Sequence, residues 1–373
     1  MMKKTFNFIF LFVSILIIIA DSTVISFAES EASYYGGDLI FEGLPDEVIE
    51  IFDELGVNSV DFESMFNVEL EDIWSIIKKL ITGSVESPLN SFIRIIVLIV
   101  ILAVFECYIP DGEKIKNIMR LSSNLLCVFS IISPLSTAVT SAVSSITVSE
   151  NFMLILVPVL ASVLSVSGNP VLAGVFQIVA FTAAQVISAV AAKLFVPLVG
   201  VILSIDITSS FMPEFKLSGL SGVIKKSVTA VISFAATLFV SFLGLKGGLA
   251  NVADSFARKG IKLVISSAVP VVGGALSEAY SGVLSSIILA KSTMGVFGIA
   301  AIALINLPSC IQLLFWIFAL RISAGVADLF DQSGISVVLK SIVSSIVLLN
   351  VIVVLVAVLY IVSTVMVIML KAN

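Results

Sequence analysis

The sequence predicts an all-α, polytopic helical membrane protein with about seven to nine spans and an internal repeat, preceded by a signal peptide and a short acidic exported segment. Composition is the first reason: 59 % of the 373 residues are apolar and 12 % are charged, whereas soluble domains average about 45–50 % and about 25 %. The second reason is a succession of apolar runs from residue 92 onward, and the third is a pair of motifs that recur later in the chain.

Residues 1–28 have the three parts of a secretory signal peptide. Lys3 and Lys4 form a positive start, Phe6 to Ala20 an apolar stretch, and Ser26-Phe27-Ala28 a small-x-small cleavage site. The alternative is a first membrane helix that is not cleaved. Either way the positive start stays in the cytoplasm, so we expect residues 29–90 on the outer side of the membrane.

The exported segment, residues 29–90, is strongly acidic, with fifteen Asp and Glu residues against Lys78 and Lys79. Apolar spacing predicts one helix from Pro45 to Gly56 and a second from Asn67 to Gly83. The apolar face of the second helix must rest on the membrane or on a partner. The alternative is a solvated, weakly ordered spacer.

The membrane body divides into residues 91–151 with the first two transmembrane helices, a first repeat unit at 152–245, a connector at 246–263 and a second unit at 264–373. Two apolar runs are shorter than the roughly 20 residues that a span needs and could be re-entrant. The candidate segments are 92–109, 118–140, 152–167, 171–192, 194–211, 223–245, 263–277, 283–305, 307–329 and 341–370.

The distribution of Lys and Arg predicts the orientation of the first spans. Lys114, Lys116 and Arg120 place the loop after 92–109 in the cytoplasm, and the next loop, 140–151, has no basic residue and is expected outside. Beyond it the rule is ambiguous. Basic residues flank both ends of 223–245, at Lys216, Lys225 and Lys226 and at Lys246, Arg258, Lys259 and Lys262.

Two motifs recur in the same order and predict an internal duplication. Val157-Pro158-Val159 returns as Val269-Pro270-Val271, at an offset of 112 residues. Ser218-Gly219-Leu220-Ser221, followed by Lys225, returns as Ser333-Gly334-Ile335-Ser336, followed by Lys340, at an offset of 115 residues.

Repeats of this kind are common in transporters, where broken helices meet near the membrane midplane. The candidate breaks, which could equally be packing kinks without any substrate, are Gly168, Asn169, Pro170, Pro270, Gly273 and Gly274.

Ionisable residues at membrane depth are costly and are therefore functional candidates. Asp206, Glu278, Arg321 and Asp328 qualify, and Glu106 lies near a helix end. The alternative is that several of them lie at the interface or form ion pairs of purely structural value.

Signatures of catalysis and of metal binding are missing from the sequence. There is no histidine, no Walker loop and no CxxC, and Cys107, Cys127 and Cys310 are far apart. We therefore expect no enzyme, no catalytic residue, no cofactor and no metal site, and no basic stripe predicts nucleic acid as a partner.

Three stretches resemble the stage III sporulation protein AE family of endospore-forming Firmicutes. The resemblance covers about residues 150–370, and Glu278 stands where we expect Asp in the family. The stretches are Leu156 to Leu164 with Ser167-Gly168-Asn169, Glu214 to Ser218 leading to Lys225-Lys226, and Val269 to Gly273 with Leu276-Ser277-Glu278-Ala279.

This resemblance implies a role in endospore formation, as a membrane subunit of the channel, or feeding tube, that joins the mother cell to the engulfed forespore. It implies a place in the mother-cell membrane around the forespore (the outer forespore membrane). The implied partners are the bilayer, the other membrane and ring-forming subunits of the stage III sporulation A operon and its secretion-type ATPase. The resemblance carries no catalytic residue to this chain.

Three readings follow from the sequence. The first is a non-enzymatic subunit of this channel that forms its membrane conduit. The second is an autonomous secondary transporter built on the repeat, with carboxylate-coupled movement of a substrate. The third is a scaffold without a conduit, which fits the lack of a clear polar pore lining.

Overall fold

In the computed structural model, residues 36–61, 64–65, 68, 70–108, 113–167, 170–211, 219–234, 237, 241 and 273–369 are described. They form helices and no strand, so the all-α class is confirmed for this part of the chain. The signal peptide, the connector at 246–263 and the second copy of the first motif lie outside these residues. The elements are α3 (Gly37–Glu42), α4 (Asp46–Glu54), α6 (Leu70–Cys107), α7 (Glu113–Val166), α8 (Pro170–Val190), the π-helical η1 (Ala191–Phe195), α9 (Val196–Phe211), a helix over 219–234, α11 (Gly273–Leu329) and α12 (Ser333–Met369).

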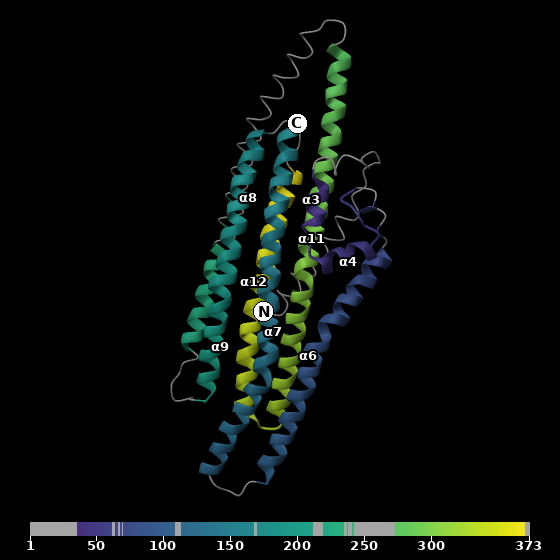
Figure 1. The fold of residues 1–373 in the computed structure, drawn as a ribbon. Coiled ribbons are helices and arrows are strands. Elements are labelled where there is room, and N and C mark those ends of the chain that lie inside the picture. Colours follow the sequence, from purple (N-terminus) through teal and green to yellow (C-terminus); the bar gives the residue numbers. More distant parts are fainter. Residues whose placement is uncertain are drawn as a thin grey trace.

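The long helices run side by side in one elongated bundle, and α3 and α4 lie against its flank (Figure 1). Five of the described helices are long and apolar enough to cross a membrane, over residues 71–106, 121–166, 185–209, 289–329 and 333–365. The protein is therefore an integral membrane protein. The total of seven to nine spans stays a prediction, because much of 235–272 is outside the described residues.

The outer loop predicted at 140–151 is wrong, because α7 continues through it as one helix of 54 residues. The runs 118–140 and 152–167 are thus parts of one element. The sequence predicts a loop there because residues 140–151 interrupt the apolar runs, but the Ser and Thr hydroxyls of this stretch bond to carbonyls of their own helix or to α11, as Thr147 does to Val143 at 3.0 Å. Similarly, α11 joins the predicted segments 283–305 and 307–329 across Pro308.

The helix end predicted at Gly83 is also wrong, since α6 continues for 38 residues through both Gly83 and Pro88. Glycine and proline lower helix stability locally, but α6 packs along α11 and α7, and this packing holds the helix together. The end of the segment predicted to be exported, residues 70–90, and the predicted first span therefore share one continuous helix.

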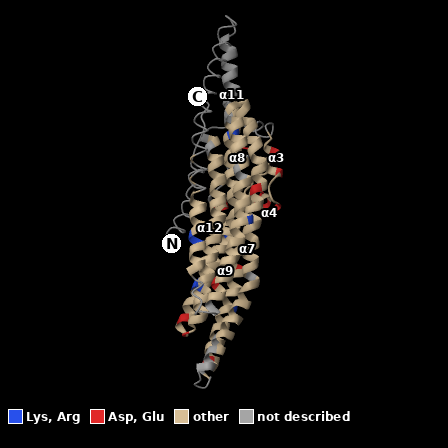
Figure 2. Cartoon of the chain, turned by 90° about the vertical axis from the view of Figure 1, so that its left-hand side faces the viewer, with Lys and Arg blue, Asp and Glu red and all other residues tan. Residues whose placement is uncertain are grey.

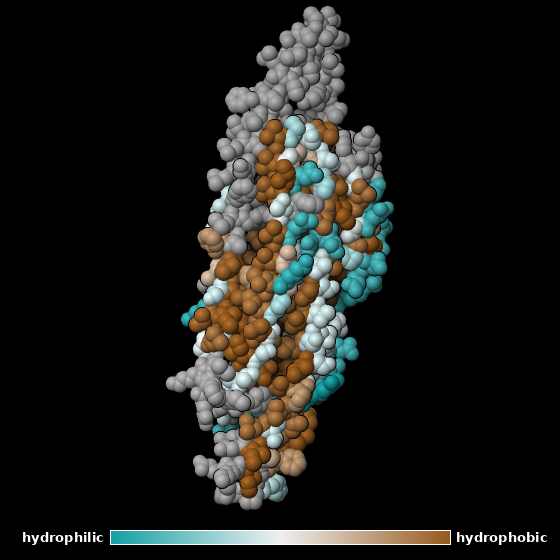
Figure 3. Space-filling view, turned by 60° about the vertical axis from the view of Figure 1, so that its left-hand side comes forward, coloured by the Kyte–Doolittle hydropathy of each residue, from teal (hydrophilic) through white to brown (hydrophobic). Residues whose placement is uncertain are grey.

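A continuous hydrophobic core joins all the long helices, with the most extensive packing between α11 and α12. Trp316 and Tyr360 are among its largest fully buried side chains. Large apolar side chains also cover outward surfaces, as the brown areas of Figure 3 show. On α6 and α7 these exposed side chains, suited to contact with lipid, are Ile93, Val97, Ile101, Val104, Phe105, Leu121, Leu125, Phe129 and Ile132.

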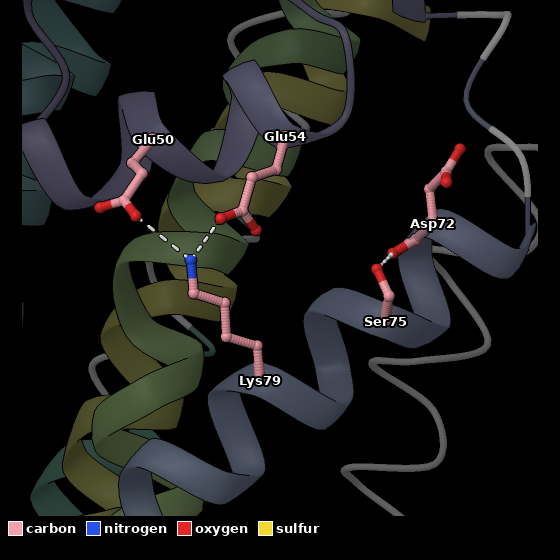
Figure 4. Close-up of polar contacts among 5 residues, drawn as sticks. All are labelled: Glu50, Glu54, Asp72, Ser75 and Lys79. Carbon is pink, nitrogen blue, oxygen red and sulfur yellow. Dashed lines mark hydrogen bonds and ion pairs between the residues drawn. The ribbon is translucent and has the colours of Figure 1, made fainter.

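The two short helices α3 and α4 pack on the bundle itself. Phe52 of α4 stacks on Phe297 of α11, with ring centroids 4.6 Å apart. A Cβ at Gly43 would lie 2.4 Å from the Cδ1 of Ile155 on α7, so glycine lets the two elements approach without displacing that side chain. Lys79 of α6 pairs with Glu50 and Glu54 of α4, as Figure 4 shows.

The ends of α6, α9 and α11 and the starts of α7 and α12 lie at one end of the bundle, which we call the turn end (Figure 1). A side-chain hydrogen bond from Gln332 to Glu106 connects the α11–α12 turn to the end of α6. Charged residues are sparse along the bundle, and acidic ones gather around α3 and α4 (Figure 2).

Candidate functional site

Asp206, a candidate residue from the sequence, forms a buried ion pair near the turn end. Its Oδ2 lies 2.7 Å from Nζ of Lys225, on the helix over 219–234. The side chain of Asp206 is 4 % exposed and that of Lys225 is 22 % exposed. Lys225 also donates a hydrogen bond to Ser344 of α12. Burial of a carboxylate is costly unless a cation compensates it, and Lys225 is the cation at this site.

Asp328 forms a second ion pair, in the neighbouring helical hairpin. Its Oδ2 lies 2.7 Å from Nζ of Lys340, and the two side chains are 48 % and 60 % exposed. The pattern matches the first pair: an Asp of one helix binds a Lys of the next helix, after the turn. Lys225 and Lys340 occupy equivalent positions of the second recurring motif, although the duplication itself stays a prediction.

A cavity of about 390 Å³ lies between the helix over 219–234, α11 and α12. Arg321, an exposed side chain of α11, lines it together with both lysines of the ion pairs. The lining that the structure describes includes three cations and no carboxylate, and the remaining lining residues are Thr229, Val343, Ser344, Val347, Leu348 and Val351. We call this space the cationic cavity.

Glu278, the fourth candidate, does not belong to this group. It lies on α11, 43 residues before Arg321, which is about 65 Å along a helix axis. Its side chain is outside the described residues. The sequence candidates therefore separate into three that gather near the turn end and one at the far end of α11.

The predicted helix breaks fall at helix boundaries where the structure describes them. Pro170 is the first residue of α8, and Gly273 and Gly274 are the first residues of α11. Gly168, Asn169 and Pro270 lie outside the described residues. Because α7 and α8 pack against each other, the chain reverses direction between them instead of continuing as one broken helix.

A row of hydroxyl and amide groups joins α7 to α11 in the bundle interior. Ser145 donates to the Asn306 carbonyl oxygen at 3.0 Å, and the Asn306 amide donates to the Ser149 hydroxyl at 2.7 Å. The hydroxyls of Ser141 and Ser309 lie 3.1 Å apart. These polar groups satisfy one another, so they cement the two helices, as polar residues often do in membranes.

Several buried polar residues were not among the sequence candidates. Lys291 of α11 is 1 % exposed. Asn350 of α12 is also 1 % exposed, and neither of its side-chain amide atoms has a hydrogen-bond partner among the described atoms. The sequence indicates Lys225 as a marker of orientation and Lys225 and Lys340 as parts of a repeated motif, but neither as a functional candidate. Lys225 and Lys340 could have been predicted as candidates, because placing a charged lysine in an apolar membrane helix is energetically costly.

Within the described residues, no group of His, Cys, Asp or Glu side chains is arranged to hold a metal ion. Cys127 and Cys310 are buried free thiols. The chemistry that this region offers is therefore the binding of charge: two carboxylates held by lysines, and a cavity that presents cations.

Comparison with known proteins shows that most of the chain matches a family model. The family model described as stage III sporulation protein AE matches residues 59–371. A curated relative, stage III sporulation protein AE of Bacillus subtilis (strain 168), is 22 % identical over 234 residues, which cover 62 % of this chain and 59 % of the relative. No solved structure matches the chain.

Proposed function

Since the chain belongs to the stage III sporulation protein AE family, we propose that it is a non-enzymatic membrane subunit of the channel complex between mother cell and forespore. The observation that carries this proposal is the family match over residues 59–371, together with a bundle that contains five helices able to cross a membrane. The proposed location is the outer forespore membrane.

The separation of charges along the molecule supports an orientation for this subunit. The exported helix α4 packs on Phe297, which lies 32 residues before the end of α11, about 48 Å along the helix. This distance exceeds the roughly 30 Å hydrocarbon core of a bilayer. The acidic segment and the turn end, which carries Lys225, Lys226, Arg321 and Lys340, thus suit opposite sides of the membrane.

The outward face of α3 and α4 suits a partner between the two membranes. Most of its apolar side chains pack on α7 and α11, and apart from Leu39 the exposed large side chains are mainly acidic. The exposed carboxylates are those of Asp38, Glu42, Asp46, Glu47, Glu50, Asp53 and Glu54. We propose that this face contacts basic surfaces of the ring-forming subunits.

Co-purification from sporulating cells tests the partnership. A tagged full-length chain should retain the ring-forming proteins and the secretion-type ATPase, and Glu47→Lys should reduce that yield. Glu86→Lys, an equally exposed change on α6, is the matched control and should leave the yield unchanged. Recovery of the tagged chain without any of these proteins would contradict the proposal.

The second candidate function is a secondary transporter, and the buried pair of Asp206 and Lys225 favours it. Such a transporter would couple substrate movement to protonation of a carboxylate in the membrane. Neutralising Asp206 and Glu278 together, as Asp206→Asn and Glu278→Gln, should then abolish function. If cells with both changes show none of the defects that deletion of the gene produces, ion coupling through these groups is excluded.

A further inference from the structure

We propose that the cationic cavity binds the phosphate of an anionic phospholipid headgroup. This inference goes beyond the proposed channel role, and only its third argument rests on the orientation proposed for the subunit. The first argument is charge. Arg321, Lys225 and Lys340 converge from three helices on the same space, and Asp206 and Asp328, which hold the two lysines, do not line it.

Three cations and no lining carboxylate favour an oxyanion over a cation or a neutral ligand. The hydroxyls do not change this, because they already donate to their own helices. Thr229 donates to the Lys225 carbonyl at 2.8 Å, and Ser344 donates to the Ser341 carbonyl at 2.7 Å. Lys225 and Lys340 already bind aspartates, but an ammonium has three N–H donors and a guanidinium has five, so the three side chains keep hydrogen-bonding capacity for an oxyanion.

The second argument is the order of polar and apolar groups along α12. The lining residues of α12 begin at Lys340, near the turn, and end at Val351, which is about 16 Å farther along the helix. Between them Val343, Val347 and Leu348 give an apolar wall. A cationic end followed by an apolar wall matches a phosphate headgroup followed by its acyl chain, whereas a free anion would use only the cationic end.

The third argument is the setting of Arg321. Its neighbours on α11 include Phe318 and Ile322, which are 64 % and 39 % exposed. Arg321 thus lies on an outward surface that otherwise suits lipid. Basic pockets between membrane helices on the cytoplasmic side are known to hold anionic headgroups, and the turn end is the side that we assign to the cytoplasm.

The test is lipid binding by the purified full-length chain in a nonionic detergent, followed by native mass spectrometry. The probes are short-chain phosphatidylglycerol, short-chain phosphatidylcholine and inorganic phosphate. We expect phosphatidylglycerol to bind about tenfold more tightly than phosphatidylcholine, and inorganic phosphate to compete only weakly. Equal binding of the two lipids would overturn the proposal. Competition by inorganic phosphate at concentrations equal to those of the lipid would show a site for free anions, which also overturns it.

Two variants locate the site. Arg321→Gln and Lys340→Gln should each lower the affinity for phosphatidylglycerol about tenfold, and Arg321→Lys should restore part of the loss. Lys226→Gln is the matched control, because Lys226 is exposed, adjacent to Lys225 and outside the lining. Unchanged affinity in Arg321→Gln and Lys340→Gln, or an equal loss in Lys226→Gln, would place the lipid elsewhere. Lys340 is 60 % exposed, so Lys340→Gln should fold normally. It therefore still tests the site if Arg321→Gln does not fold.

Discussion

At the scale of single residues, the two ion pairs near the turn end differ mainly in burial. Asp206 is 4 % exposed, whereas Asp328 is 48 % exposed, although each carboxylate lies 2.7 Å from its lysine. Removing one partner of a buried pair leaves an uncompensated charge, which costs far more than removing one partner of an exposed pair. The same chemical change should therefore have different consequences at the two sites.

Asp206→Ala should destabilise the protein by about 3 kcal/mol, because it leaves Lys225 partly buried without its carboxylate. The measurement is thermal unfolding of the purified chain in detergent. The double variant Asp206→Ala/Lys225→Met should recover part of that loss, and Asp328→Ala, the matched control, should cost less than Asp206→Ala. An equal loss of stability in Asp206→Ala and Asp328→Ala would show that burial does not determine the cost of removing the carboxylate.

The sequence predicts some of the residues of this region as candidates, but not the ion pairs that they form. Costly charges in apolar helices drew attention to Asp206, Arg321 and Asp328, which lie in or next to the cavity region. Lys225 and Lys340 were interpreted as signals of orientation and of repetition. Their pairing could not be predicted, because it depends on which helices become neighbours.

At the scale of elements, α7 shows how a polar stretch can belong to a membrane bundle. Its Ser141, Ser145 and Ser149 recur every four residues, so they form one stripe that faces Asn306 and Ser309 of α11. Hydropathy alone treats such a stripe as a loop. The helix could have been predicted from the spacing, but its partner could not.

Asn306→Ala should destabilise the bundle by about 1–3 kcal/mol, because the Ser145 and Ser149 hydroxyls lose their shared partner in the interior. Thermal unfolding in detergent measures this loss. The control is Thr147→Val, since the exposed Thr147 hydroxyl bonds only to its own helix, at Val143, among the contacts described here. A loss in Thr147→Val as large as that in Asn306→Ala would show that the stripe has no special role.

Amide hydrogen exchange distinguishes a continuous α7 from the loop predicted at 140–151. Backbone amides inside a packed helix exchange slowly, whereas loop amides exchange close to the rate of an open chain. We expect residues 140–151 to be as protected as residues 125–135 of the same helix. Rapid exchange confined to residues 140–151 would show that they form the predicted loop and not part of a continuous helix.

At the scale of the whole molecule, about 48 Å of helix separates the acidic face of α3 and α4 from the turn end. The class, the membrane location and the family could all be predicted from composition, apolar runs and three quoted stretches. The lengths of α6, α7 and α11 could not, because Gly83, Pro88 and Pro308 are tolerated once neighbouring helices pack against them.

The packing of α3 and α4 on the bundle is also a property of the whole molecule. Phe52→Ala removes the ring that stacks on Phe297 and should release α3 and α4 from α11. Limited proteolysis of the purified chain should then cut within residues 36–61 faster than in the unchanged protein, at least severalfold. Phe234→Ala, a change of the same kind at an exposed ring, is the control and should leave the cleavage rate unchanged. No acceleration in Phe52→Ala would mean that the stacked pair does not hold the segment.

The central claim is that this membrane protein serves the connection between mother cell and forespore. The most direct measurement is deletion of the gene, followed by membrane-dye microscopy of sporulating cells and a count of heat-resistant spores. We predict that forespores collapse after engulfment and that few heat-resistant spores form, with recovery when the intact gene is restored. Normal forespores and a normal spore count would contradict the claim and favour the transporter.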